Sequence, residues 1–122
     1  MPVTYSFAGE VLEISAVGAY PTADVTRTFR DAISDPERPI LRALLYDVRE
    51  STVIGSRSTP DVQAAISFFE SLAPHIGRRV ALLASSDAGY GVMRMVAGWA
   101  AAAGLEAEVF RDRDAALEWA SR

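Results

Sequence analysis

The chain has 122 residues, of which 50% are hydrophobic and 23% are charged, and its formal net charge at pH 7 is −4. The length predicts one domain, and the negative charge argues against nucleic-acid binding, which depends mainly on cations that neutralise phosphates. The chain has no cysteine, and all twelve of its cationic residues are arginines. Disulfides, thiolate catalysis, Schiff-base chemistry and Walker-type phosphate sites are therefore excluded.

No apolar run reaches the ~18 residues that a transmembrane helix needs. The N-terminal residues lack a basic region followed by an apolar core, so no signal peptide is visible. We therefore expect a cytoplasmic protein without a membrane span. The glycine-rich motifs that bind phosphates or dinucleotides are also missing, and we expect no cofactor.

The first third of the chain predicts a β-hairpin followed by a helix. Apolar and polar residues alternate over residues 4–16, with Gly9 between the two runs, as is typical of half-buried strands. From Thr22 the apolar residues recur at helical spacing instead. Asp35 and Pro36 are expected to end that helix.

The middle of the chain predicts a buried strand and a long helix. Residues 40–48 form a nearly continuous apolar run, as expected of a central strand covered on both faces. After a polar loop, an apolar stripe at helical spacing predicts a helix with Thr59 as its N-cap and Pro60 in its first turn. Pro74 lies inside this stripe, so the last turn is expected to kink or to stop early.

The last third predicts two more strands and two more helices. Residues 79–84 form a second buried strand, which is followed by a helix with an apolar face that Gly104 closes. Residues 106–110 are typical of a short edge strand, and residues 112–121 predict a final helix. Four aromatic residues on these apolar stripes are expected in the core: Phe29, Phe69, Trp99 and Trp119.

The predicted order is β-β-α-β-α-β-α-β-α in a single domain over residues 1–122. Alternating strands and helices predict an α/β fold with right-handed crossovers. The sheet is expected to be five-stranded and mixed, but mostly parallel, with four flanking helices. The first strand, entered through a hairpin, should lie antiparallel at an edge.

Asp47 ends the predicted central strand, at the edge of a parallel sheet that carries ligands in such folds. A phosphoacceptor role of the receiver-domain type is excluded, because it would need a lysine. We favour the interpretation that Asp47 caps the following loop by accepting backbone hydrogen bonds. The alternative is that Asp47 contacts a ligand.

The loop after Asp47 is rich in serine and threonine. Turn formation and helix capping account for most such hydroxyl groups. Ser56 or Ser58, just before a predicted helix, could also be phosphorylated. The free N–H groups of the helix would stabilise the added charge, which would change the surface offered to a partner.

A second candidate segment, residues 85–91, follows the other buried strand and is rich in small residues, so a ligand could approach its backbone closely. Asp87 would repel a phosphate and is expected to be an N-cap. Tyr90 and Arg94 lie one helical turn apart and off the apolar stripe. They are either two solvated side chains or the lining of a polar groove beside the Asp47 loop.

Two further residues stand out on the long helix that begins near Thr59. His75 is the only histidine of the chain and has no evident catalytic or zinc-binding partners, so we expect it to be a favourable cation near a helix C terminus. Phe68 lies roughly 100° from the centre of its helix's apolar stripe. We expect it to be an exposed apolar anchor in a dimer or partner interface.

The chain resembles the SpoIIAA-like superfamily, in particular its small stand-alone STAS/SEC14-type domains. The resemblance covers most of the chain. It is carried by residues 44–49, the strand at residues 78–81, the helix around Trp99 and the C-terminal stretch of residues 109–119. It implies a non-enzymatic binding module.

In anti-sigma factor antagonists of this superfamily, a serine in the loop after the central strand is phosphorylated by a partner kinase, and the dephosphorylated form binds that partner. The resemblance places Ser56 nearest to that serine. The family's Asp-Ser-Ser-Gly motif is absent, because residues 54–57 read Ile-Gly-Ser-Arg.

Our leading hypothesis is a regulatory or scaffold domain that binds a protein partner, or a second copy, through residues 51–60 and the helix that follows. The alternative is a carrier or sensor of a small apolar or lipid-like ligand. Small residues near Met93 would leave room for it: Ala97, Gly98, Ala101 and Ala102. An enzyme that uses Asp47, Tyr90 and Arg94 is the least supported, because it requires a raised aspartate pKa that no sequence feature indicates.

Overall fold

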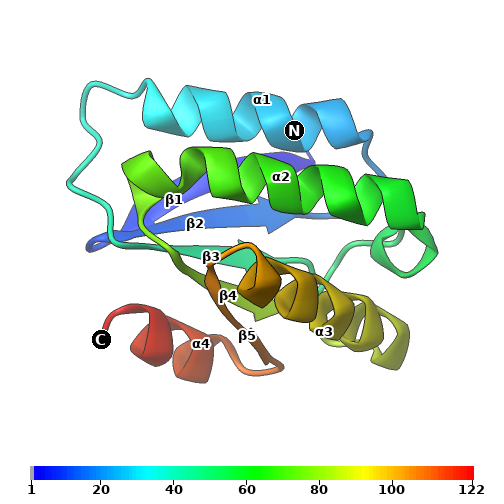
Figure 1. Ribbon diagram of the computed structural model, residues 1–122. Coiled ribbons are helices and arrows are strands. Elements are labelled where there is room, and N and C mark those ends of the chain that lie inside the picture. The colour runs from blue at the N-terminus through cyan, green and yellow to red at the C-terminus, as the bar shows by residue number, and fades with distance from the viewer. Residues whose placement is uncertain (1) are drawn as a thin grey trace.

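The computed structural model describes residues 2–122 as a five-stranded sheet with helices on both faces (Figure 1). Three helices, α1, α2 and α3, cover one face, and α4 covers part of the other. The strands are β1 (Val3–Ala8), β2 (Val11–Ala16), β3 (Ala43–Asp47), β4 (Arg79–Leu83) and β5 (Glu106–Phe110). The helices are α1 (Thr22–Ile33), α2 (Thr59–Ile76), α3 (Asp87–Ala102) and α4 (Arg113–Ala120), with a short 3-10 turn, η1 (Ile54–Ser56).

The strands lie in the sheet in the same order as in the chain, β1-β2-β3-β4-β5. β1 is antiparallel to β2, while the other three pairs are parallel. Gly9 closes the hairpin between β1 and β2 with a φ of 61°, which a glycine adopts without strain. The predicted order of elements, the mixed sheet and the antiparallel edge strand are confirmed.

The predicted central strand is wrong at its N-terminal end. β3 begins at Ala43, whereas Ile40 lies in the preceding loop and is 88% exposed. Within β3, Leu44 and Leu45 face opposite sides of the sheet and are both fully buried, which explains the continuous apolar run. Hydrophobicity alone does not mark where strand pairing starts, so the predicted strand wrongly included the exposed Ile40.

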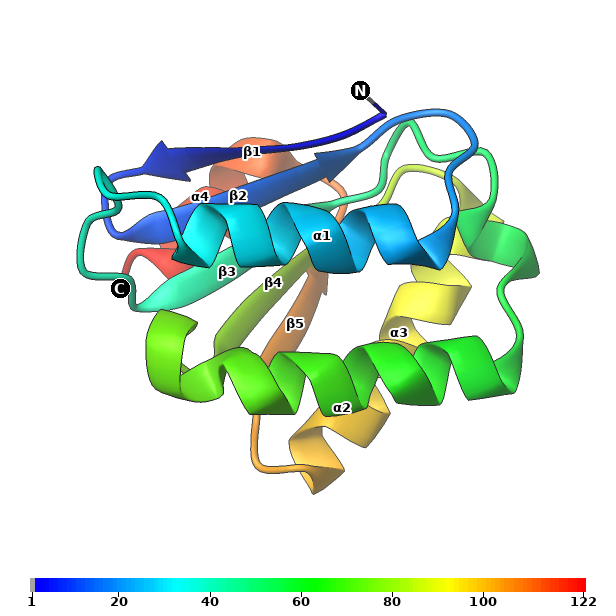
Figure 2. The same cartoon turned by 90° about the horizontal axis from the view of Figure 1, so that it is seen from above.

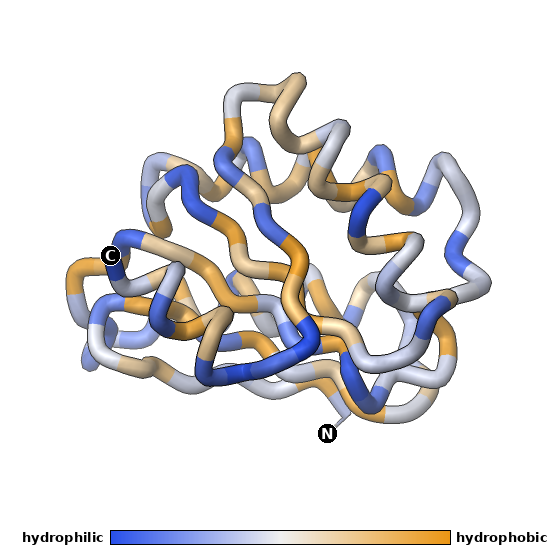
Figure 3. Tube along the Cα trace, turned by 90° about the horizontal axis from the view of Figure 1, so that it is seen from below, coloured by the Kyte–Doolittle hydropathy of each residue, from blue (hydrophilic) through white to orange (hydrophobic). Residues whose placement is uncertain are grey.

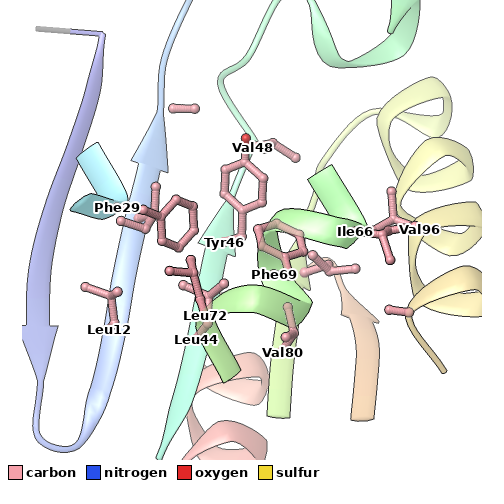
Figure 4. Packing of buried hydrophobic residues seen from close by; sticks show 14 of the residues in the cluster. Leu12, Phe29, Leu44, Tyr46, Val48, Ile66, Phe69, Leu72, Val80 and Val96 are labelled. Carbon is pink, nitrogen blue, oxygen red and sulfur yellow. The ribbon is translucent and has the colours of Figure 1, made fainter. Parts of the chain in front are cut away.

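The larger part of the core lies between the sheet and the three helices on one face. Phe29 of α1 and Phe69 of α2 pack edge to face at 5.8 Å between ring centroids, and each ring also lies against Tyr46 of β3 (Figure 4). Figure 3 shows the alternation of apolar and hydrophilic stretches along the chain that this layered packing requires. Trp99 and Trp119, expected in the core, are only half-buried at its margins.

α2 runs through Pro74 to Ile76 and neither stops early nor loses its last turn. It ends at Gly77, whose φ of 81° and contact with the backbone of Arg42 leave no room for a side chain. A Cβ atom at Gly77 would lie 2.1 Å from the Arg42 carbonyl oxygen. The close approach therefore requires glycine.

The predicted N-caps are both wrong by one residue. Ser58, not Thr59, caps α2, because its side chain accepts a hydrogen bond from the N–H of Asp61. Ser86, not Asp87, caps α3 through the N–H of Gly89 at 3.0 Å. In both cases two adjacent residues are suitable caps by type, and the backbone conformation selects the first.

Within residues 2–122, no helix combines the length and apolar character that crossing a membrane requires.

Candidate functional site

The C-terminal ends of β2, β3 and β4 meet at one edge of the sheet and surround an open polar hollow of about 310 Å³. Five residues line this hollow: Ser15, Asp47, Arg49, Glu50 and Ser85. Ser15 and Asp47 are register partners on neighbouring parallel strands, and Ser85 follows β4. Asp47 therefore lies where α/β folds hold ligands, as the sequence predicted.

Asp47 is fully engaged by Arg49. Its Oδ1 atom accepts hydrogen bonds from the backbone N–H of Arg49 at 3.0 Å and from the Nε of the same residue at 3.1 Å, while Oδ2 accepts from Nη2 at 3.1 Å. This hydrogen bonding raises the pKa of Arg49. The loop-capping interpretation of Asp47 is confirmed, with the Arg49 side chain as an additional partner.

A second ion pair lies beside the first on the α4 face of the sheet. Arg113, at the start of α4, donates from Nε and Nη2 to the two carboxylate oxygens of Glu13 at 2.9 and 2.7 Å. Hydrogen bonding to Glu13 raises the pKa of Arg113, and the charge of Asp47 adds to the effect. Asp47 and Glu13 are therefore each neutralised by an arginine, whereas Glu50, which also lines the hollow, has no side-chain partner within residues 2–122.

The loop between β3 and α2 is anchored to the body by contacts that the sequence did not reveal. The Tyr20 hydroxyl lies 2.9 Å from the Ser51 hydroxyl, which also accepts the N–H of Ile54 at 3.2 Å. Arg57 donates from Nη2 to the Tyr20 carbonyl at 2.9 Å and stacks over the Tyr20 ring at 5.1 Å. The only available signal was the local concentration of hydroxyl residues, which points to no partner 31 or 37 residues away.

Ser56 and Ser58 are both exposed on this loop. The Ser56 hydroxyl donates to the carbonyl of Val53 at 3.0 Å, at the end of η1. The Ser58 hydroxyl is used as the N-cap of α2. Ser56 is thus the less committed of the two hydroxyl groups.

A partly open, mainly apolar cavity of about 50 Å³ lies beneath the loop, between β3 and the three helices. Its polar groups come from five residues: Tyr20, Thr22, Tyr46, Arg57 and Asp61. Burial raises the pKa of Tyr46 far above its ordinary value of 10.0, and its hydroxyl lies at the end of the ring nearest the loop (Figure 4). The apolar lining includes Val25, Ile54, Val62, Phe69, Met93 and Val96.

The small residues that suggested room for a ligand near Met93 do not line this cavity. Gly98, Ala101 and Ala102 are exposed; Gly98 and the half-buried Ala97 lie beside β5, and Ala102 lies beside α2. That reason for a carrier function is wrong, because small side chains at helical spacing do not reveal which side of the helix meets the sheet.

Tyr90 and Arg94 do line a groove, but not beside the Asp47 loop. Their groove lies between α3 and β5 and includes Glu108. Asp87 is fully exposed and forms an ion pair with Arg111 at 3.0 Å, and the Arg111 guanidinium stacks over the Tyr90 ring at 4.4 Å. The seven candidate residues are therefore distributed over separate surfaces and form no single site.

Phe68 is not an exposed anchor. It is half-buried, and its ring packs edge to face against Phe29 at 5.4 Å between centroids. Because α1 lies beside α2 on the same face of the sheet (Figure 2), α2 buries a wider arc than its central stripe. His75 is exposed in the last turn of α2, at the position expected from the sequence.

Across residues 2–122, no three histidine, cysteine, aspartate or glutamate side chains are grouped so that they could hold a metal ion. Hydrogen-bonded arginine pairs, an anchored loop and a small apolar cavity are the features that the described chain provides for recognition.

Comparison with known proteins identifies a fold but no annotated relative. No family model matches the chain. No curated protein matches it either. Among solved structures, the chain is similar to the crystal structure of an uncharacterized protein of the DUF3478 family, with a SpoIIAA-like fold, from Shewanella loihica PV-4. The identity is 17%, the TM-score is 0.61, and the match covers 97% of this chain and 91% of that one. The chain therefore has the SpoIIAA-like fold that its sequence resembles.

Proposed function

We propose that the chain is a non-enzymatic regulatory or scaffold module that binds a protein partner through its loop surface, defined as residues 49–60. The observation that carries this proposal is the way in which the loop is held. Tyr20, Ser51 and Arg57 fix it to the body of the domain, while Ser56 remains exposed. A rigidly supported, exposed loop offers a partner a preformed surface at a low entropic cost.

Phosphorylation of Ser56 would regulate this surface. The residue next to it, Arg57, donates to the Tyr20 carbonyl and stacks on the Tyr20 ring. A phosphate on Ser56 would compete for the Arg57 guanidinium, because charge-assisted hydrogen bonds to phosphate are stronger than those to a neutral carbonyl. Release of Arg57 would free the loop and change the surface that a partner meets.

The pairing of charges at the sheet edge supports a binding role rather than catalysis. Asp47 and Glu13 each accept two hydrogen bonds from an arginine side chain. A general base needs an available carboxylate close to its substrate, with a pKa matched to the working pH. Carboxylates held by arginine in this way are poorly suited to that role.

The test is a quantitative pull-down from native lysate with the wild-type chain, Ser56→Ala and Ser56→Asp. The proposal expects one stoichiometric partner that the wild type and Ser56→Ala retain and Ser56→Asp loses. Ser121→Asp, which adds the same charge at the far end of α4, is the matched control and should bind as the wild type does. If none of the four proteins retains a partner, the proposal is contradicted.

A second candidate function, a carrier or sensor of a small apolar ligand, is supported by the cavity beneath the loop. Its lining is mostly apolar, with the hydroxyl of Tyr46 as a potential hydrogen-bond donor. Ordinary ligand pockets measure roughly 300–1,000 Å³, so a cavity of about 50 Å³ admits only a very small molecule unless the loop moves. Native mass spectrometry of freshly purified protein tests this: a bound small molecule supports a carrier, and a clean apoprotein contradicts it.

A further inference from the structure

The outer edge of β5 is not paired with another strand. β5 is the last strand of the sheet and pairs with β4 alone among residues 2–122. The N–H of Glu106 donates to the carbonyl of Arg78 at 2.8 Å, and the carbonyl of Phe110 accepts from the N–H of Ala84 at 3.0 Å. The even-numbered residues of β5 therefore direct their backbone groups toward the sheet.

Along a strand of a parallel sheet, each residue directs its N–H and C=O groups to one side, and successive residues alternate between the two sides. Ala107 and Val109 consequently point theirs away from β4, at an edge where the described part of the chain places no further strand. Such a row of unused donors and acceptors is a template for one more strand. β5 thus offers two N–H and two C=O groups in the geometry that strand addition requires.

The space beside this edge is a shallow, open groove. It has a volume of about 520 Å³ and lies between α3 and β5. Its helix wall is made by Tyr90, Arg94, Ala97 and Gly98, and its strand side by residues 107–109. Nothing occupies the position that a Cβ atom at Gly98 would take, so this wall leaves room for side chains of an incoming chain.

Two charged residues border the groove, and within residues 2–122 neither has a partner. Neither Arg94 nor Glu108 makes an ion pair or a side-chain hydrogen bond to any of residues 2–122, although both line the groove. Because side chains alternate along a strand, Glu106 and Glu108 project on the α4 side of the sheet, whereas Ala107 and Val109 face α3. The two faces of an added strand would therefore meet different chemistry.

We propose that an extended peptide segment of another protein binds in this groove as a sixth strand, paired with β5. Its residues on the α4 side are cationic and lie opposite Glu108, which has no partner within residues 2–122, and Glu106, which already pairs with Arg79 at 3.4 Å. Its residues on the α3 side are small or β-branched and pack against Ala97 and Gly98. Backbone hydrogen bonds to Ala107 and Val109 supply affinity, and the alternation of cationic and apolar side chains along the peptide supplies specificity.

A second copy of this chain fits the groove poorly. An antiparallel pair of β5 strands uses all outward groups of Ala107 and Val109 only when these residues pair with each other across the two-fold axis. That register places Glu108 opposite Glu108 of the second copy, and like charges directly opposite one another are destabilising. The glutamates thus disfavour self-association and favour a cationic strand.

This inference is independent of the proposed loop surface, because the groove and residues 49–60 share no residue. The probe is a capped seven-residue peptide in which valine alternates with lysine, and the comparison peptide has glutamate in place of lysine. Titration is followed by amide NMR and by calorimetry. We expect the lysine peptide to bind and to slow hydrogen exchange at the amides of Ala107 and Val109. Absence of binding, or equal binding of the glutamate peptide, overturns the proposal.

Protein variants test which groups contribute. Glu108→Lys should weaken the lysine peptide about fivefold and favour the glutamate peptide, whereas Glu37→Lys, near the opposite edge of the sheet, should change neither. Val109→Pro removes one outward N–H, a change that an edge strand tolerates. It should weaken binding about tenfold. Equal effects of Glu108→Lys and Glu37→Lys would overturn the charge argument.

Two modified peptides keep the test valid if Val109→Pro fails to fold. One carries N-methyl groups on its valine amides and the other on its lysine amides. Only one set of amides faces β5, the valine set in an antiparallel and the lysine set in a parallel arrangement. Loss of binding by one of the two peptides supports strand addition, while loss by neither or by both overturns it.

Discussion

The Arg49 guanidinium binds both carboxylate oxygens of Asp47, with Nε–Oδ1 and Nη2–Oδ2 distances of 3.1 Å each. The backbone N–H of Arg49 donates to the same carboxylate at 3.0 Å, so the Asp47 side chain fixes the first turn of the chain after β3. The Arg49 carbonyl in turn accepts a hydrogen bond from the Ser85 hydroxyl at 2.8 Å. Asp47 thereby connects the end of β3 to the segment after β4.

Asp47→Asn should lower the free energy of unfolding by about 1 kcal/mol, because it removes a charge-assisted pair that is partly open to solvent. Urea denaturation measures the change. Glu50→Gln is the matched control: Glu50 lines the same hollow with no side-chain partner among residues 2–122, and its substitution should cost less than about 0.5 kcal/mol. Equal stabilities of the two variants would contradict the anchoring role of Asp47.

The N-cap of α2 can be tested with two adjacent alanine substitutions. Ser58→Ala removes the acceptor for the Asp61 N–H and should cost about 1 kcal/mol. Thr59→Ala replaces the first helical residue, which makes no capping bond, and should be close to neutral. Thermal unfolding followed by circular dichroism distinguishes the two, and a larger loss from Thr59→Ala would restore the assignment made from the sequence.

Phe68 was predicted to be exposed but is half-buried, whereas Ile40 was predicted to lie in a buried strand but is exposed. Phe68→Ala should destabilise the domain by about 2 kcal/mol, since it removes a ring that packs on Phe29. Ile40→Ala should change the unfolding free energy by less than about 0.5 kcal/mol, because Ile40 is 88% exposed. Chemical denaturation of both variants provides the measurement. The reverse ranking would contradict this packing.

Stability should fall as the pH rises above 10.0, the ordinary pKa of tyrosine. Burial raises the pKa of Tyr46 in the folded state, so above pH 10 the unfolded chain loses this proton more readily and is favoured. Below pH 10 the contribution of Tyr46 to stability is fully present. Tyr46→Phe should therefore flatten the alkaline fall in unfolding free energy.

The control for the pH experiment is Tyr5→Phe. Hydrogen bonding to Asp35 raises the pKa of Tyr5, but Tyr5 lies nearer the surface. Its substitution should flatten the alkaline fall less than Tyr46→Phe does. If Tyr46→Phe and the wild type lose stability in parallel as the pH rises above 10, Tyr46 does not contribute in this way.

Gly77→Ala should destabilise the chain by about 2 kcal/mol or more, or prevent folding, because its Cβ would collide with the Arg42 carbonyl. Gly91→Ala is the matched control. It lies within α3 with open space around it and should gain about 0.5–1 kcal/mol from helix propensity. Opposite signs of the two changes in melting temperature are the expected result.

The order of elements was predictable because each one carries its own periodicity. The change from a period of two to helical spacing at Thr22, and the uninterrupted apolar run that contains Leu44 and Leu45, needed no knowledge of distant residues. The loop-capping role of Asp47 was predictable for the same reason, since its partner Arg49 lies two residues away.

The contacts that shape the loop could not be predicted, because they join distant parts of the chain. Tyr20 is 31 residues from Ser51 and 37 from Arg57, and none of the three carries a motif. The burial of Phe68 likewise depends on the position of α1, which no local pattern of α2 contains. Adjacent hydroxyl residues such as Ser58 and Thr59 are too similar for type alone to identify the cap.

The sequential strand order has a consequence for how the protein is made. As the chain leaves the ribosome, each parallel strand finds its neighbour already synthesised, so the sheet can grow by one strand at a time. Its second face is different. Leu45 and Leu83 on this face become buried only after α4 has been synthesised, because Ala116 and Ala120 of α4 complete their hydrophobic cluster. Nascent chains that lack α4 therefore expose an apolar surface, and we expect chaperones to bind most strongly at this stage.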